Sequence, residues 1–118
     1  MTRDIQIKRA YLPASRDDGT RVLIDRIWPR GLSREVAAFD GWAKDIAPSA
    51  ELRRWFNHDP DRFIEFGRRY RHELQAKREG LMDLLAFGET KRLTLIYGAR
   101  DEVHNHAVVL AAYLKDLA

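Results

Sequence analysis

The stretch RVLIDRIWPRG, residues 21–31, decides the fold. Its first part, Arg21 to Ile27, is a largely apolar run typical of a strand buried on both faces of a sheet. Trp28-Pro29 ends that strand, because proline lacks the N–H that the ladder needs and restricts the residue before it. The Trp28–Pro29 bond is expected to be trans, the usual isomer.

Two further strands are predicted on either side of this stretch. Ile5 to Tyr11 forms a short strand, and Leu93 to Tyr97 forms a second buried one. Helical sequence separates Arg21–Ile27 from Leu93–Tyr97, so these two strands are expected to be parallel.

Helix starts are marked by capping residues between the strands. Ser33 is expected to cap one short helix, Asp40 a second one carrying Trp42 and Ile46, and Ser49 a third. Asp59-Pro60 is a strong start for a long helix that runs to about Lys77. A helix over Leu81 to Phe87, ended by Gly88, and a last helix after Asp101 complete the prediction.

The chain has 118 residues and fits one domain over residues 1–118. The predicted fold is α/β, with a small, mostly parallel sheet of about three strands flanked by four to six helices. The chain has no cysteine, which excludes disulfides and thiolate catalysis and favours a cytoplasmic location. No apolar run reaches the roughly 20 residues that span a bilayer, and no signal peptide is evident, so no membrane partner is expected.

Two polar loops follow the two central strands, at the edge where open α/β sheets bind ligands. In the first loop, Arg26 and Arg30 bracket Trp28 and could clamp a phosphate or carboxylate, with Trp28 as a wall. Alternatively, Arg26 pairs internally with Asp25 or a helix glutamate, and Trp28 plugs the core. Of the 21 basic residues, 16 are arginine, which suits such anions but also follows from a GC-rich genome.

The second loop, YGARDEVHNH, leads into the last helix. Asp101 is expected to cap that helix, and His106 could act as a general acid or base. His104 and His106 point about 200° apart on a helix, so a shared metal ion with Asp101 is disfavoured and no metal is predicted.

The long helix carries Arg68, Arg69 and Arg71, a basic cluster that could bind nucleic acid. Interspersed glutamates break the stripe, and an Arg69–Glu73 pair at i and i+4 is expected. Nucleic acid is therefore the less favoured partner. No glycine-rich phosphate loop or serine-hydrolase elbow is present.

Four stretches together resemble the DUF488 family of uncharacterised proteins, in its short YeaO-like branch. They are VLIDRIWPRG (22–31), WAKDIAPSAELRRWF (42–56), DPDRFIEFGRRYRHEL (59–74) and TLIYGARDEVHNHAVVL (94–110). The resemblance implies no established reaction, substrate or cofactor. A longer branch carries Cys-His-Arg where this chain has Asn105-His106-Ala107, so thiol chemistry does not carry over and His106 is the shared element.

The functional prediction is a crevice for a small anionic ligand at the carboxyl ends of the central strands, with hydrolase- or transferase-type chemistry as an added option. Its catalytic candidates are His106 and Asp25. Its ligand-binding candidates are Arg26, Trp28, Arg30, Arg53, Tyr97 and Asn105. The alternatives are a nucleic-acid-binding or regulatory interaction module and a purely structural polar network. The cofactor and the oligomeric state stay unknown.

Overall fold

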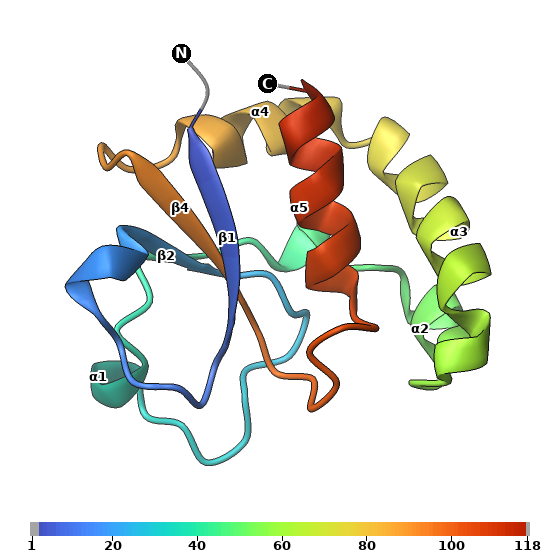
Figure 1. Cartoon of the computed structure of the whole chain (residues 1–118), viewed down its shortest axis with the longest axis horizontal. Coiled ribbons are helices and arrows are strands. Elements are labelled where there is room, and N and C mark those ends of the chain that lie inside the picture. Colours follow the sequence, from blue (N-terminus) through green and yellow to red (C-terminus); the bar gives the residue numbers. More distant parts are fainter. Residues whose placement is uncertain (1–2, 118) are drawn as a thin grey trace.

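A computed structural model describes residues 3–117 of the chain. Four parallel strands form one sheet in the order β1-β4-β2-β3 (Figure 1). They are β1 (Asp4–Arg9), β2 (Thr20–Leu23), β3 (Gly41–Trp42) and β4 (Arg92–Tyr97). β4 lies between β1 and β2, pairing Ile5 with Leu93 and Val22 with Leu95. The predicted parallel arrangement and the α/β class are therefore confirmed.

Five α-helices lie in the described residues, together with three short 3-10 turns. The helices are α1 (Arg34–Ala37), α2 (Ala50–Phe56), α3 (Phe63–Gln75), α4 (Arg78–Ala86) and α5 (His106–Leu117). The 3-10 turns are η1 (Arg16–Asp18), η2 (Lys44–Ile46) and η3 (Pro60–Arg62). None of the helices in residues 3–117 combines the length and the apolarity that crossing a membrane requires.

The two faces of the sheet are covered differently. Figure 1 shows α3, α4 and α5 on one side of the sheet and α1 beyond β2 on the other. The helical side holds the large core, in which Leu95, Tyr70 and Leu110 are all fully buried. The opposite side holds a small cluster around Leu23 and Ile96. Alternate residues of β4 point to opposite faces, so this one strand contributes to both cores.

Several predicted caps are confirmed. The Ser33 hydroxyl accepts from the Val36 N–H at the start of α1, and the Ser49 hydroxyl accepts from the Leu52 N–H at the start of α2. Asp59 caps the turn that begins with Pro60 and leads directly into α3. Side-chain acceptors at these positions satisfy N–H groups that have no partner inside the helix, which is why the sequence marks them well.

Several predicted elements differ from the structure in extent or type. The strand expected over Ile5 to Tyr11 ends at Arg9, and the helix expected from Leu81 begins at Arg78. The strand expected over 21–27 ends at Leu23, because Asp25 bonds the Gly98 N–H with its side chain and takes the place of a ladder contact. The helix expected after Asp40, carrying Trp42 and Ile46, is replaced by β3 at Trp42 and by the short 3-10 turn η2 at Ile46. Asp40 instead accepts a hydrogen bond from the Arg21 N–H, and the next residues form β3 at the sheet edge.

Candidate functional site

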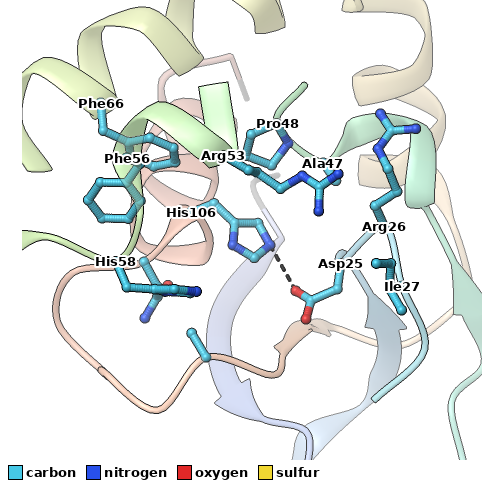
Figure 2. Close-up of a pocket in the computed structure, with 12 residues that line it drawn as sticks. Asp25, Arg26, Ile27, Ala47, Pro48, Arg53, Phe56, His58, Phe66 and His106 are labelled. Atoms are coloured by element: carbon cyan, nitrogen blue, oxygen red, sulfur yellow. Dashed lines mark ion pairs between the residues drawn. The ribbon is translucent and has the colours of Figure 1, made fainter. Parts of the chain in front are cut away.

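A cavity of about 230 Å³ opens at the carboxyl ends of β2 and β4 (Figure 2). Its polar lining residues come from the loop after β2, from α2 and the loop after it, and from the junction before α5: Asp25, Arg26, Arg53, His58, Asn105 and His106. Its apolar lining residues are Ile27, Ala47, Pro48, Phe56, Phe66 and Ala99. This edge of an open parallel sheet is where ligands of α/β proteins gather.

Asp25 is fixed by the loop that follows β4. Its Oδ2 accepts a hydrogen bond from the Gly98 N–H at 2.9 Å. A Cβ atom at position 98 would lie only 2.9 Å from the same oxygen, so a larger residue there would require the carboxylate to shift. The carboxylate is consequently held in one orientation at the cavity floor.

His106, the first residue of α5, lies against this carboxylate. Its Nε2 is 2.9 Å from Asp25 Oδ1 and 3.3 Å from the carbonyl oxygen of Ile24 (Figure 2). The two side chains are 15% and 21% exposed, so both reach the cavity from a largely buried position. The Ile24 carbonyl oxygen is the hydrogen-bond partner of Nε2 and favours the tautomer that carries its proton there, whereas Asp25 Oδ1 is close to Nε2 but makes no hydrogen bond among the described residues.

The turn before α5 is built by Asp101 and Asn105. The Asn105 side chain accepts from the Val108 N–H and donates to the carbonyl oxygen of Asp101, so Asn105 and not Asp101 caps the helix. Asp101 accepts from the N–H groups of Val103 and His104. The hydrogen bond from the His104 backbone is the main reason why the pKa of Asp101 falls to about 2. The capping residue of α5 is therefore Asn105 and not Asp101 as predicted.

Arg53 reaches into the cavity from α2. Figure 2 shows its guanidinium group between His106 and Arg26, above the Asp25 carboxylate. Its Nε is buried and has no hydrogen-bond partner among the described residues. A buried donor without a partner is rare in native proteins, because it has lost its water without gaining another acceptor. Among the described residues, the cavity lining therefore holds one buried donor without a partner, Arg53 Nε, and one buried acceptor without a partner, Asp25 Oδ1.

Arg26 lines the opposite wall and is exposed. It extends away from Asp25 in Figure 2, and no salt bridge from Arg26 is found within residues 3–117. The alternative that Arg26 pairs internally with Asp25 is thus not observed, and the side chain that contacts the Asp25 carboxylate is His106. Both arginines keep their charge available to the cavity.

Three predicted ligand-binding residues lie outside the cavity lining. The Trp28 ring packs 5.2 Å from the Phe39 ring and donates from its indole nitrogen to the carbonyl oxygen of Leu32. Trp28 is accordingly the core plug that the sequence offered as an alternative. Arg30 is exposed on the surface beyond it. Tyr97 is only 2% exposed, and this burial raises its pKa.

His58 lines the cavity but was not singled out from the sequence. It follows Asn57, which ends α2 in the left-handed conformation, and has a positive φ of 53° itself. Its ring centroid is 6.3 Å from that of Phe56. A histidine in a short interhelical loop gives no periodic signal, and only the packing of α2 and α3 against the sheet edge brings it to the cavity.

The arginines of α3 are largely compensated. Arg68 and Arg69 both bond Glu65, at 2.7 and 2.8 Å to the same oxygen, and these bonds lower the pKa of Glu65 to about 2. The predicted Arg69–Glu73 pair is wrong, because Glu73 instead bonds the backbone N–H and hydroxyl of Ser49. The basic stripe is therefore a set of local ion pairs beside the α2 cap.

No group of three metal-ligating side chains is found in residues 3–117. His104 and His106, which were weighed above as ligands of one metal ion, have different partners. His104 Nδ1 lies 2.9 Å from Asp101, while His106 contacts Asp25. The donor set at this end of the sheet is thus arranged in separate acid–histidine pairs.

Comparison with known proteins places the chain among uncharacterised relatives. The family whose model matches residues 4–118 is described as an inactive DUF488-N3 subclade. The chain is 40% identical to the uncharacterised protein YeaO of Escherichia coli (strain K12), over 97% of this chain and 99% of that protein. It is also 40% identical to the uncharacterised protein Rv3073c of Mycobacterium tuberculosis, over 93% of this chain and 92% of that protein. No solved structure matches the chain.

Proposed function

This chain belongs to the DUF488-N3 subclade described as inactive, and we propose that it binds a small phosphate- or carboxylate-bearing ligand in the cavity beyond β2 and β4. The single observation that carries the proposal is Arg53. Its buried Nε has no hydrogen-bond partner among the described residues, and its guanidinium is directed into the cavity. A planar guanidinium matches the geometry of a carboxylate or phosphate, so such an anion would satisfy it.

The charges around Arg53 support an anion. Arg26 adds a second cation. The one carboxylate in the lining, Asp25, accepts from the Gly98 N–H with Oδ2, and its Oδ1 lies 2.9 Å from His106 Nε2 without a hydrogen bond among the described residues. Counting only the arginines and the carboxylate, the cavity lining carries two positive charges and one negative charge. The first turn of α5 also faces the cavity through Asn105 and His106, and the positive end of a helix dipole adds to this preference.

Catalysis is the second candidate, and the His106–Asp25 contact at 2.9 Å is the observation that favours it. A carboxylate that orients an imidazole is the arrangement used in general acid–base catalysis. The description of the subclade as inactive favours binding over turnover. Incubation with an aryl phosphate whose released phenol absorbs light separates the two: release that disappears in His106→Ala supports catalysis, and no release supports binding alone.

Nucleic-acid binding through α3 is the less supported alternative. Its cations are engaged locally, because Arg68 and Arg69 share Glu65 and Arg71 lies 3.6 Å from Asp116. A nucleic-acid surface would show an affinity that falls steeply with salt, because neutralised phosphates release counterions. Salt-dependent binding to short DNA or RNA that does not require Arg53 would favour this alternative.

The test of anion binding is thermal unfolding with inorganic phosphate, acetate and a panel of phosphorylated and carboxylated metabolites. A ligand at about 100 times its dissociation constant stabilises the fold by about 2.7 kcal/mol, several degrees for a domain of this size. The wild type is expected to shift and Arg53→Ala is expected not to shift.

Arg54→Ala is the matched control for this test. Arg54 is the next residue of α2, has the same charge, is exposed and does not line the cavity. Arg30→Ala serves as a second control, because Arg30 also lies outside the cavity lining. Equal shifts in wild type and Arg53→Ala, or shifts lost equally in both controls, would contradict the proposed site.

A further inference from the structure

The cavity has two chemically different ends. Arg53, Arg26 and the His106–Asp25 pair form one end. The other end is a wall of rings, in which Phe56 and Phe66 are stacked with their centroids 4.2 Å apart. The His58 ring continues this wall, at 6.3 Å from Phe56 and tilted by 47°. A bare inorganic anion would use only the charged end.

His58 is held at this wall by an unusual backbone. Asn57 and His58 both have positive φ, 49° and 53°. Asparagine and histidine adopt this conformation more often than most residues, but each still carries some strain that glycine would not. In this conformation the imidazole contributes to the cavity lining while His58 stays exposed to solvent. Strained residues of this kind cluster at ligand sites, which directs attention to the ring of His58.

The size of the cavity limits what can fill both ends. A cavity of about 150 Å³ holds benzene, and pockets that enclose drug-sized ligands begin near 300 Å³. At about 230 Å³, this cavity lies between those two sizes. It accommodates one ring together with an anionic group, whereas a nucleotide with base, sugar and phosphate exceeds it.

We propose that the ligand is a small aromatic acid with a single ring, whose phosphate or carboxylate is bound by Arg53 and whose ring packs against Phe56 and His58. This inference rests on the anion site proposed above and adds the nature of the group attached to the anion. It also assigns His58 as the residue that selects for an aromatic ligand. Aromatic pairs prefer tilted or offset contacts, and the tilted Phe56–His58 wall offers these to a third ring.

The test compares matched ligands by calorimetric titration. Phenyl phosphate is measured against inorganic phosphate and cyclohexyl phosphate, benzoate is measured against acetate, and adenosine monophosphate is the larger competitor. In at least one of the two series, the wild type is expected to bind the aromatic ligand at least tenfold more tightly than the bare anion. Arg53→Ala is expected to lose binding of the aromatic ligand and of the bare anion.

Variants at Asn57 and His58 distinguish the effect of the His58 ring on binding from the effect of the positive-φ backbone on folding. His58→Gly keeps the positive φ without strain but removes the ring, so it is expected to abolish the aromatic preference and leave the binding of phosphate itself in place. His58→Phe is expected to retain the preference. Asn57→Gly changes the neighbouring positive-φ residue, which does not line the cavity, and is expected to bind like the wild type.

The outcomes distinguish this inference from the anion site on which it rests. Equal affinity for the aromatic ligands and the bare anions, all dependent on Arg53, would overturn the aromatic ligand and preserve the anion site. Tighter binding of cyclohexyl phosphate or adenosine monophosphate than of phenyl phosphate, with no preference for benzoate over acetate, would overturn it as well. No binding of any of these compounds would overturn both proposals.

Discussion

The protein contains two clusters of charged residues beside its central strands, and they differ in how completely the charges are paired. In the first, Asp18 bonds Arg21 at 2.6 Å and Lys8 at 2.9 Å, and the other terminal nitrogen of Arg21 donates to the carbonyl oxygen of Ala37. In the second, Arg53 enters a cavity with a buried Nε that has no partner among the described residues. Arg21 also has one unpartnered nitrogen, its Nε, but both ends of its guanidinium are bonded.

This difference separates structural from binding roles. The Asp18 cluster is closed: Asp18 and Arg21 are each 3% exposed, and each charge faces its opposite. Burial alone would raise the pKa of Asp18, but the bonds from Lys8, Ser15 and Arg21 lower it overall. The Arg53 cluster is open to solvent through the cavity and has capacity left for an acceptor. We therefore expect substitutions in the first cluster to change stability and those in the second to change binding.

The largest expected effect is that of Asp18→Ala. Removing this carboxylate leaves the buried Arg21 without its counter-charge, and breaking one partner of a buried ion pair costs about 3–5 kcal/mol. Chemical denaturation should show this loss in the free energy of unfolding. A loss below about 1 kcal/mol is typical of an exposed ion pair, and it would contradict the structural role assigned to the Asp18 cluster.

Tyr70→Phe is expected to have an intermediate effect. The buried Tyr70 hydroxyl donates to the carbonyl oxygen of Ile46 at 2.7 Å, and burial raises the pKa of that hydroxyl. Its loss leaves a buried acceptor unsatisfied, which costs about 1–3 kcal/mol. The same denaturation experiment measures it. The Tyr70 ring lies 6.4 Å from that of His106, beside the cavity. Unchanged anion binding in Tyr70→Phe would show that the Tyr70 hydrogen bond stabilises the fold without affecting the anion site.

Arg53→Ala is expected to change stability by no more than about 0.5 kcal/mol, as for a residue without structural partners. This variant is the counterpart of Asp18→Ala, because it removes a charge from the open cluster. Denaturation curves of Arg53→Ala and the control Arg54→Ala should coincide without ligand. A destabilisation of several kcal/mol in Arg53→Ala alone would mean that Arg53 belongs to the structural framework.

The smallest expected effect is a local pH dependence in the loop before α5. The pKa of Asp101 falls from 3.8 to about 2, so its contribution to stability is complete above 3.8 and is lost as the pH falls toward 2. An NMR titration of the Val103 and His104 amides should show a midpoint near 2 in the wild type. Asp101→Asn retains an acceptor for both amides and should abolish the transition, whereas a midpoint near 3.8 in the wild type would contradict the structure.

Much of the fold could be predicted from local signals in the sequence. The apolar runs before Asp25 and before Gly98 identified the two central strands, and Ser33, Ser49 and Asp59 marked helix starts by their capping chemistry. The two-residue β3 could not be predicted, because so short a strand carries no periodicity and depends on pairing with β2. Strand length also depended on a distant contact, that of Asp25 with Gly98.

The candidate site could be predicted in part. The rule that ligands bind at the carboxyl ends of parallel strands placed Asp25, Arg26 and His106 together, and they do line one cavity. Trp28 and Arg30 were included because they are neighbours in sequence, yet the chain turns after Ile27 and carries them away from it. His58 could not be found, because its position depends on how α2 packs beside the sheet edge.

The most direct test of the central claim is an NMR titration of the arginine side-chain Nε–H signals with phenyl phosphate. Arg53 Nε and Arg21 Nε are both buried and have no hydrogen-bond partner within residues 3–117, but only Arg53 lines the cavity, and Arg78 is an exposed reference. We predict a saturable shift of the Arg53 signal, with the Arg21 and Arg78 signals unchanged. An Arg53 signal that stays fixed, or that moves no more than that of Arg78, would contradict an anion site in this cavity.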